Sequence, residues 1–153
     1  MPATVDLTEM LRADDIHFGF RAASTIEAIP LLLQPALARR IGDRAVIDSV
    51  IAAAIRREED TSTRCGPLAL PHARTAAVPE FILALGVNPA GVIAGQAEPR
   101  LMFAFVSPEQ RREEHLRLLA SLARLSQNAW IVEKICSASN AGEVLEILRG
   151  AGV

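Results

Sequence analysis

Lysine is almost absent from this chain of 153 residues, which holds it only at position 134. Lys134 follows Glu133 in a helical pattern with no glycine loop before it, and this excludes a Walker-type P-loop. The same setting offers no pocket that would desolvate the amine, so Schiff-base chemistry is excluded as well. Nucleotide hydrolysis through a P-loop and lysine-based covalent catalysis therefore drop out of the candidate functions.

Cysteine is also scarce, with Cys65 and Cys136 far apart in the chain. Neither belongs to a CxxC pair or to a Cys/His cluster with zinc spacing, so the sequence predicts no structural metal. No basic segment precedes a short apolar run near the start, and no apolar run reaches 18 residues. We therefore expect a cytoplasmic chain with reduced thiols and no insertion into a membrane.

An excess of positive charge is missing too. Sixteen Lys and Arg residues face 18 Asp and Glu, for a net charge of −2, so nucleic acid is not an expected partner. What the chain does have is apolar residues, which make up 50% of it, enough for a substantial core. The length is that of one ordinary domain, and we assign residues 1–153 to it.

The hydrophobic pattern interleaves strands with helices. Apolar alternation or continuous apolar runs predict strands at Ile16–Phe20, Leu68–Leu70, Phe81–Val87 and Leu101–Val106. Capping residues predict helices that begin at Asp6, Ser24, Asp43, Ser107, Asn128 and Asn140, the one from Ser107 reaching about Gln127 and the last ending at Gly150. Pro30 and Pro35 predict a kink or an early stop in the helix after Ser24. These elements indicate an α/β fold with a mixed sheet of four or five strands flanked by helices on both faces.

His72 is the strongest candidate for chemistry. It follows Leu70 and Pro71, and the proline fixes its own φ and favours an extended Leu70, so His72 emerges from a rigid strand end. Groups that would bind a transferring phosphoryl group lie nearby in the sequence: the guanidinium groups of Arg56, Arg57, Arg64 and Arg74 and the hydroxyls of Ser62 and Thr63. The plainer interpretation is a solvated helix end at 56–60 and a surface histidine without a role.

His115 and His17 are the remaining histidines. Leucines at 118, 119 and 122 share the helical face of His115, so this ring points to the core side. It is either a core-edge histidine with one hydrogen bond or a partner of His72, and in the second case the two imidazoles should lie within about 7 Å. His17 lies on the polar face of its strand and is not expected to take part.

Two motifs in this order resemble the enzyme IIA components of the phosphoenolpyruvate-dependent phosphotransferase system, of the fructose, mannitol and nitrogen-regulatory type. The first is Arg57-Glu58-Glu59-Asp60-Thr61-Ser62-Thr63, continuing to Leu68-Ala69-Leu70-Pro71-His72-Ala73-Arg74. The second is Leu101 to Pro108 followed by Glu114-His115-Leu116-Arg117-Leu118-Leu119. The resemblance covers about Leu7 to Gly150.

The resemblance implies a transferase component that takes a phosphoryl group on His72 from a histidine phosphocarrier protein. By the same resemblance His115 would lie beside His72 as a second catalytic residue, and Arg57 rather than Arg56 would approach the site. Together with Thr63, Arg64 and Arg74 from the local sequence, we expect Arg57 to bind the phosphoryl group. No metal or organic cofactor is implied, and a permease, a transporter or a sensor kinase would be a further partner. Sugar uptake and regulation of nitrogen or ion transport both fit this family.

The chain departs from the family pattern after the Ser-Thr pair. Arg64-Cys65-Gly66-Pro67 replaces a glycine-rich stretch and is one residue shorter, and Pro67 lacks the N–H that could reach a phosphate. If the loop still forms a phosphate cradle, its backbone donors should face His72. If it does not, the alternative is a regulatory protein-binding module with weakened or lost phosphorylation, in which His72 is covered or already hydrogen-bonded at its nucleophilic nitrogen.

Overall fold

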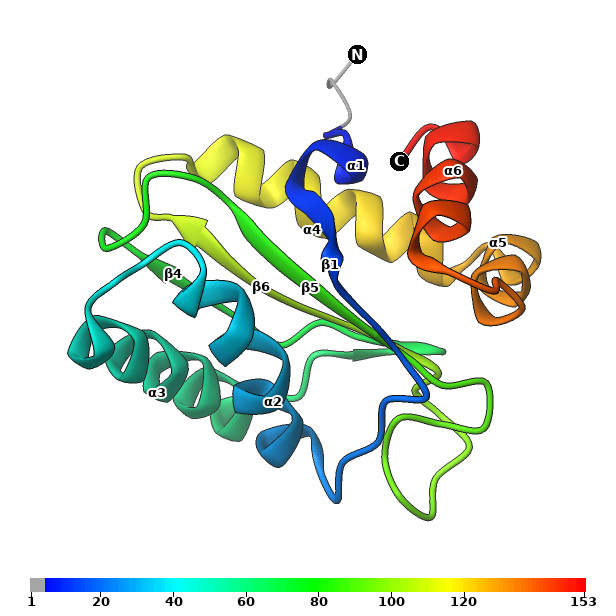
Figure 1. Ribbon diagram of the computed structural model, residues 1–153, viewed down its shortest axis with the longest axis horizontal. Coiled ribbons are helices and arrows are strands. Elements are labelled where there is room, and N and C mark those ends of the chain that lie inside the picture. Colours follow the sequence, from blue (N-terminus) through cyan, green and yellow to red (C-terminus); the bar gives the residue numbers. More distant parts are fainter. Residues whose placement is uncertain (1–4) are drawn as a thin grey trace.

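A mixed sheet lies between two layers of helices in the computed structural model, which describes residues 5–153 (Figure 1). Its strands follow the order β1-β5-β6-β3-β2, and β4 pairs with β6 outside this path. The strands are β1 (Leu11–Phe18), β2 (Arg64–Cys65), β3 (Leu68–Ala69), β4 (His72–Thr75), β5 (Ile82–Val87) and β6 (Leu101–Pro108). The β5/β6 and β2/β3 pairs are antiparallel, whereas β1/β5, β3/β6 and β4/β6 are parallel.

β3 and β4 are two pieces of one line of chain along the same edge of β6. Leu68 pairs with Leu101 and His72 pairs with Phe105, while Pro71 stands between the two pieces. Proline has no N–H to donate, yet the Pro71 carbonyl still accepts from the Phe105 N–H at 3.1 Å, so the line stays attached to β6. The path through the sheet is thus five strands long, and the predicted α/β class is confirmed.

Two helical layers bury opposite faces of the sheet. The helices are α1 (Leu7–Met10), α2 (Thr25–Ala38), α3 (Arg44–Asp60), α4 (Arg112–Ser126), α5 (Ala129–Cys136) and α6 (Ala141–Ala151). Large side chains such as Phe103 and Phe105 face the core under α4, α5 and α6. Smaller ones such as Ala73 and Ala104 face the core under α2 and α3. Because successive strand residues point to opposite faces, His72 lies on the Phe105 side and Ala73 on the α3 side.

Most predicted caps are confirmed. The side chains of Ser24, Asp43, Asn128 and Asn140 each accept a hydrogen bond from a backbone N–H in the first turn of the helix that follows. Asp6 does the same for the short α1. Each cap satisfies a donor that the helix itself leaves without a partner.

Three boundary predictions are wrong. The first strand begins at Leu11 and not at Ile16, because Leu11 already pairs with Leu83 of β5, and the register then shifts between Leu11 and Ile16. α2 does not stop early but continues through Pro30 and Pro35 to Ala38, since one face of that helix is fully buried against the sheet. The final helix ends at Ala151, one residue after the predicted stop, and Gly152 closes it in the left-handed conformation at φ 75°.

The predicted cap at Ser107 is wrong as well. Ser107 is fully buried inside β6, and α4 begins only at Arg112, with no side-chain cap at Arg111. A Ser-Pro pair followed by Gln fits a helix start, but the strand extends over it because Arg74 and Thr75 continue the pairing with Ser107 and Pro108. Within residues 5–153, no helix has the length and apolar character needed to cross a bilayer.

Candidate functional site

The ring of His72 is held at both nitrogens. Nδ1 lies 2.7 Å from the carbonyl oxygen of Leu70, and Nε2 lies 3.0 Å from Nε of Arg57. A carbonyl oxygen can only accept and a guanidinium can only donate, so Nδ1 carries the proton and Nε2 presents its lone pair. The side chain therefore occupies one tautomer, with Nε2 as the nucleophilic atom.

The backbone around Pro71 explains this geometry. The Pro71 carbonyl points to β6, where it accepts from Phe105, and the Leu70 carbonyl is left to accept from the His72 ring two residues later. Proline fixes φ at position 71 and restricts Leu70 to extended conformations. The Pro-His pair thus fixes the orientation of the His72 ring through local backbone geometry.

Burial keeps His72 neutral. The residue is 3% exposed, and its ring stacks on Phe105 with centroids 4.6 Å apart and planes within 8°. Desolvation is the main cause that lowers the pKa of His72, and the Arg57 charge adds to it, while the hydrogen bond to Leu70 and the Glu58 charge oppose the shift without cancelling it. A neutral imidazole has the free lone pair that nucleophilic attack requires.

His115 lies beside His72, so the structure meets the paired alternative and its limit of about 7 Å. The ring centroids are 5.3 Å apart, and Nδ1 of His115 lies 2.7 Å from the hydroxyl oxygen of Ser107. Burial lowers the pKa of His115 to about 4, with further contributions from His72, Arg74 and Arg57. Both rings are therefore neutral at pH 7, and Ser107 fixes how the second one is oriented.

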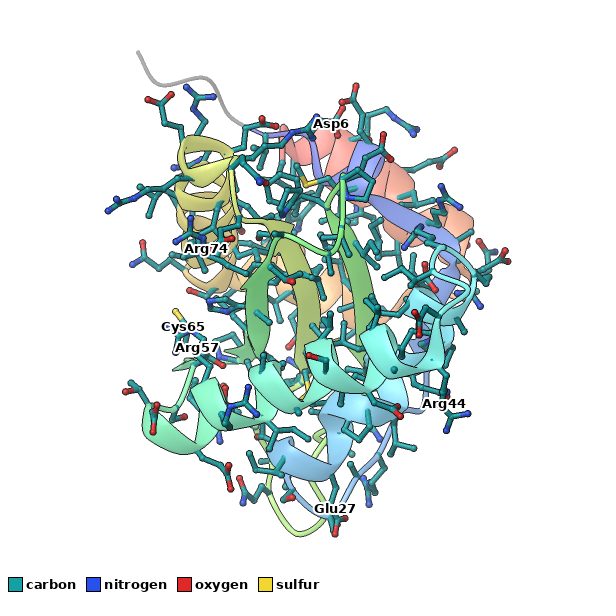
Figure 2. The ribbon with its side chains drawn as sticks, turned by 90° about the vertical axis from the view of Figure 1, so that its left-hand side faces the viewer. Asp6, Glu27, Arg44, Arg57, Cys65 and Arg74 are labelled. Carbon is teal, nitrogen blue, oxygen red and sulfur yellow. The ribbon has the colours of Figure 1, made fainter. Side chains whose placement is uncertain are left out.

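A cavity of about 380 Å³ opens onto these rings. It is lined by Ala53, Arg57, His72, Ala73, Arg74, His115 and Leu119. Figure 2 shows Arg57 and Arg74 on the same side of the molecule, one from the end of α3 and the other from β4. Arg74 donates to the Glu109 carbonyl at 2.9 Å, and within residues 5–153 neither Arg57 nor Arg74 has a carboxylate within 4.0 Å.

The structure places the other two predicted phosphate-binding residues elsewhere. The Thr63 hydroxyl donates to Glu58 at 2.6 Å, and this bond uses the one O–H proton of Thr63. Arg64 points toward Gln96, with 3.4 Å between Nη1 and Oε1, and neither residue lines the cavity. Residues 64–69 form a tight hairpin turned at Gly66, which has φ 58°, so the shortened loop is a β-turn that also contributes nothing to the cavity wall.

Sequence reasoning missed two residues that contact the rings, Phe105 and Ser107, and gave no role to Glu58, which bonds to Thr63. Phe105 is an unremarkable member of an apolar run, and it meets His72 only through the β4/β6 register. Ser107 carried a signal, but one that favoured a helix cap. His17 lies on β1, separated from β4 by two strands, and takes no part in the site.

The arrangement combines a neutral ring nitrogen with two arginines that form no ion pair within the described residues 5–153. Such a pocket attracts an anion and can stabilise the charge on the oxygens of a transferring phosphoryl group. Among the described residues, no three His, Cys, Asp or Glu side chains gather in a way that could hold a metal ion. A neutral ring nitrogen beside two arginines can accept a transferred group at Nε2.

Comparison with known proteins identifies relatives over most of the chain. The model of the family "Phosphoenolpyruvate-dependent sugar phosphotransferase system, EIIA 2" matches residues 9–151. The mannitol-specific EIICBA component of Escherichia coli K12 is 28% identical over 145 residues, which is 92% of this chain and 22% of that protein. The chain spans 22% to 37% of the length of the curated relatives it matches.

Two solved structures are similar in fold. The nitrogen regulatory protein IIA-Ntr of Neisseria meningitidis is 27% identical with a TM-score of 0.77, covering 93% of this chain and 98% of that one. The E. coli mannitol enzyme IIA, determined in complex with phosphorylated enzyme IIB, is 22% identical with a TM-score of 0.71, covering 92% of this chain and 99% of that one.

Proposed function

Because the chain belongs to the EIIA 2 family of the phosphoenolpyruvate-dependent sugar phosphotransferase system, we propose that it carries a phosphoryl group on Nε2 of His72. The observation that carries this proposal is the bond from Nδ1–H of His72 to the Leu70 carbonyl, which leaves the lone pair on Nε2. A ring held in this tautomer needs no proton removed before it attacks.

The transfer step balances without a cofactor. The Nε2 lone pair of His72 attacks the phosphorus of a phosphohistidine on the donor protein, and the N–P bond of the donor breaks in line. The electron pair of that bond stays on the donor's ring nitrogen, and the product on His72 is a phosphoramidate. The reverse of the same step passes the group to the next acceptor.

Arg57, Arg74 and His115 surround the position that the phosphoryl group would take. Arg57 releases Nε2 when the donor docks and then donates to a phosphoryl oxygen, so one side chain first protects and later binds. Arg74 adds a second cation from β4. His115, fixed through Ser107, offers its Nε2 side to the phosphoryl group or its oxygens.

The donor in this proposal is a histidine phosphocarrier protein. The onward acceptor is either an enzyme IIB of a sugar permease or a regulated transporter or sensor kinase. Relatives of both kinds support the two routes, since one similar structure is a mannitol enzyme IIA bound to phosphorylated IIB and another is a nitrogen regulatory IIA.

A second candidate function is a regulatory module that binds a partner without accepting phosphate. Two observations favour it: Nε2 of His72 is already bonded to Arg57, and the histidine is only 3% exposed. The hairpin at 64–69 also supplies no phosphate cradle. In this case the covered nucleophile would be the functional state and not a resting one.

Incubation with phosphoenolpyruvate and the two general phosphotransferase proteins separates the candidates. A carrier takes up one acid-labile phosphoryl group, which is lost in His72→Ala and kept in the control His17→Ala. A regulatory module takes up none, while its partner is retained on the wild type and on His72→Ala alike. Phosphate uptake that survives in His72→Ala would overturn the assignment of the nucleophile.

A further inference from the structure

The last turn of α3 is connected to both ring nitrogens of His72, to one by a direct hydrogen bond and to the other through a chain of hydrogen bonds. Arg57 donates directly to Nε2 at 3.0 Å. The next residue, Glu58, lies at the start of a chain of hydrogen bonds that ends at Nδ1. This chain runs through Thr63 and Leu70, neither of which lines the cavity.

Glu58 holds Thr63 with both carboxylate oxygens. Oε1 accepts from the Thr63 hydroxyl at 2.6 Å and Oε2 accepts from the Thr63 N–H at 3.1 Å. The bonds are charge-assisted on the acceptor side, and the pair is partly buried, so they are stronger than ordinary neutral hydrogen bonds. Thr63 is thereby fixed in both its backbone and its side chain.

Thr63 in turn holds Leu70. The Leu70 N–H lies 3.2 Å from Oγ1 of Thr63 and 3.3 Å from its carbonyl oxygen, so both acceptors of Thr63 share this donor. The hydroxyl of Thr63 has its single proton on Glu58, which turns an oxygen lone pair toward Leu70. Pro71 limits the backbone of Leu70 further, and the Leu70 carbonyl then accepts from Nδ1–H of His72 at 2.7 Å.

We propose that Glu58 is a positioning residue that acts through Thr63 and Leu70 to hold His72 in the Nδ1–H tautomer. The proposal rests on the function proposed above and deepens it: consecutive residues of one helical turn set both ring nitrogens, Arg57 by protecting the nucleophile and Glu58 by fixing the proton opposite it. Glu58 touches neither the ring nor the phosphoryl group and is no catalytic residue.

The test compares the same substitution at adjacent acids. Glu58→Gln removes one of the two acceptor oxygens and the charge, whereas the control Glu59→Gln changes an exposed side chain outside the hydrogen-bond chain. Nitrogen-15 NMR of the unphosphorylated protein reads the tautomer of His72 directly. We expect Glu58→Gln to mix the two tautomers and to slow phosphoryl uptake about tenfold, with Glu59→Gln unchanged in both.

Thr63 provides a second pair of variants. Thr63→Val keeps the shape but loses the hydroxyl, so it should also mix the His72 tautomers and slow phosphoryl uptake. Thr63→Ser keeps the hydroxyl, so its tautomer and uptake rate should match those of the wild type. A merely structural role would lower the melting temperature of Glu58→Gln without changing the tautomer. An unmixed Nδ1–H tautomer in folded Glu58→Gln and Thr63→Val overturns the proposal.

Two outcomes keep this inference separate from the proposed function. If the wild type accepts no phosphoryl group while the His72 tautomer still depends on Glu58, the carrier function fails and the positioning role stands. If these variants do not fold, the wild type itself decides: slow exchange of the Thr63 hydroxyl proton and of the Leu70 amide proton supports the hydrogen-bond chain, and fast exchange of both overturns it.

Discussion

Arginines gather at both edges of the sheet, and their partners differ. At the β1 edge, Asp15 is completely buried and forms ion pairs with Arg39 and with Arg40 at the end of α2. At the β4 edge, Arg57 bonds to a neutral ring nitrogen and Arg74 to a backbone carbonyl. Charge is compensated inside the protein at the first edge and left uncompensated at the second.

This difference separates an anchor from a binding site. A buried carboxylate without cationic partners would be strongly destabilising, so the arginines near Asp15 are committed to the fold. The arginines near His72 could be removed without leaving a buried charge, and their positive field remains available to an incoming anion. The fold therefore places His72 beside two arginines that form no ion pair within residues 5–153, while the nearby Glu58 carboxylate is engaged by Thr63.

The largest effect on stability should come from removing the ion pairs of Asp15 at the β1 edge. The double variant Arg39→Met/Arg40→Met removes both cations from the fully buried Asp15, and we expect the free energy of unfolding to fall by about 3 kcal/mol. Arg44→Met is the matched control, because its pair with Asp48 is mostly exposed and should contribute less than about 0.5 kcal/mol. Denaturant unfolding measures both. Unchanged stability in Arg39→Met/Arg40→Met would contradict the anchor role of this edge.

Low pH should destabilise the fold through the histidines at the β4 edge. The pKa of His115 is about 4 in the fold, below the ordinary value of 6.5, so the unfolded chain binds the extra proton between these values. The free energy of unfolding should therefore fall as pH drops from about 6.5 to 4, by up to about 3 kcal/mol, with the lowered pKa of His72 acting in the same direction.

The variant His115→Gln isolates this contribution. It removes the titrating ring, so the wild type should lose more stability than the variant between pH 7 and pH 4.5. Denaturant unfolding at the two pH values gives the comparison. Equal losses would mean that His115 is not held neutral by its surroundings.

Arg57→Ala tests whether the uncompensated charge serves transfer. Loss of a charge-assisted contact in the transition state costs about 1.5 to 3 kcal/mol, which slows phosphoryl uptake by more than about tenfold. Arg56→Ala alters the neighbouring exposed arginine and should leave the rate unchanged. Quenched-flow reactions with a phosphorylated donor measure the rate of phosphoryl uptake. A fast Arg57→Ala protein would assign the charge compensation to Arg74 instead.

The smallest effect is expected at Arg64. This side chain points to Gln96 and lies outside the cavity wall, so Arg64→Ala should change the uptake rate by less than about twofold. The same assay measures it. A tenfold loss would show that the 64–69 hairpin rearranges when the donor protein docks.

Local chemistry made much of the fold predictable. Ser24, Asp43, Asn128 and Asn140 cap helices through contacts within three residues, and such contacts are visible in the sequence. The apolar runs at β5 and β6 are buried on both faces, as continuous hydrophobic stretches predict. The paired histidines followed from helical periodicity combined with the family motifs.

The wrong predictions concern positions whose structure depends on contacts with residues distant in the sequence. Asp15 looked like part of a polar segment before the first strand, but arginines 24 and 25 positions later allow it to be buried in β1. Ser107 looked like a helix cap, but its hydroxyl contacts His115 from inside β6. The stacking of Phe105 on His72 depends on strand register, which no local pattern of this sequence specifies.

The position of the phosphoryl group on the ring tests the account most directly. Phosphorus-31 and nitrogen-15 NMR of the phosphorylated protein distinguish a bond at Nε2 from one at Nδ1. The hydrogen bond from Nδ1 of His72 to Leu70 predicts a single phosphoryl group on Nε2 of His72, with Nδ1 still protonated. A phosphoryl group on Nδ1, or on His115, would contradict the tautomer on which the proposed transfer depends.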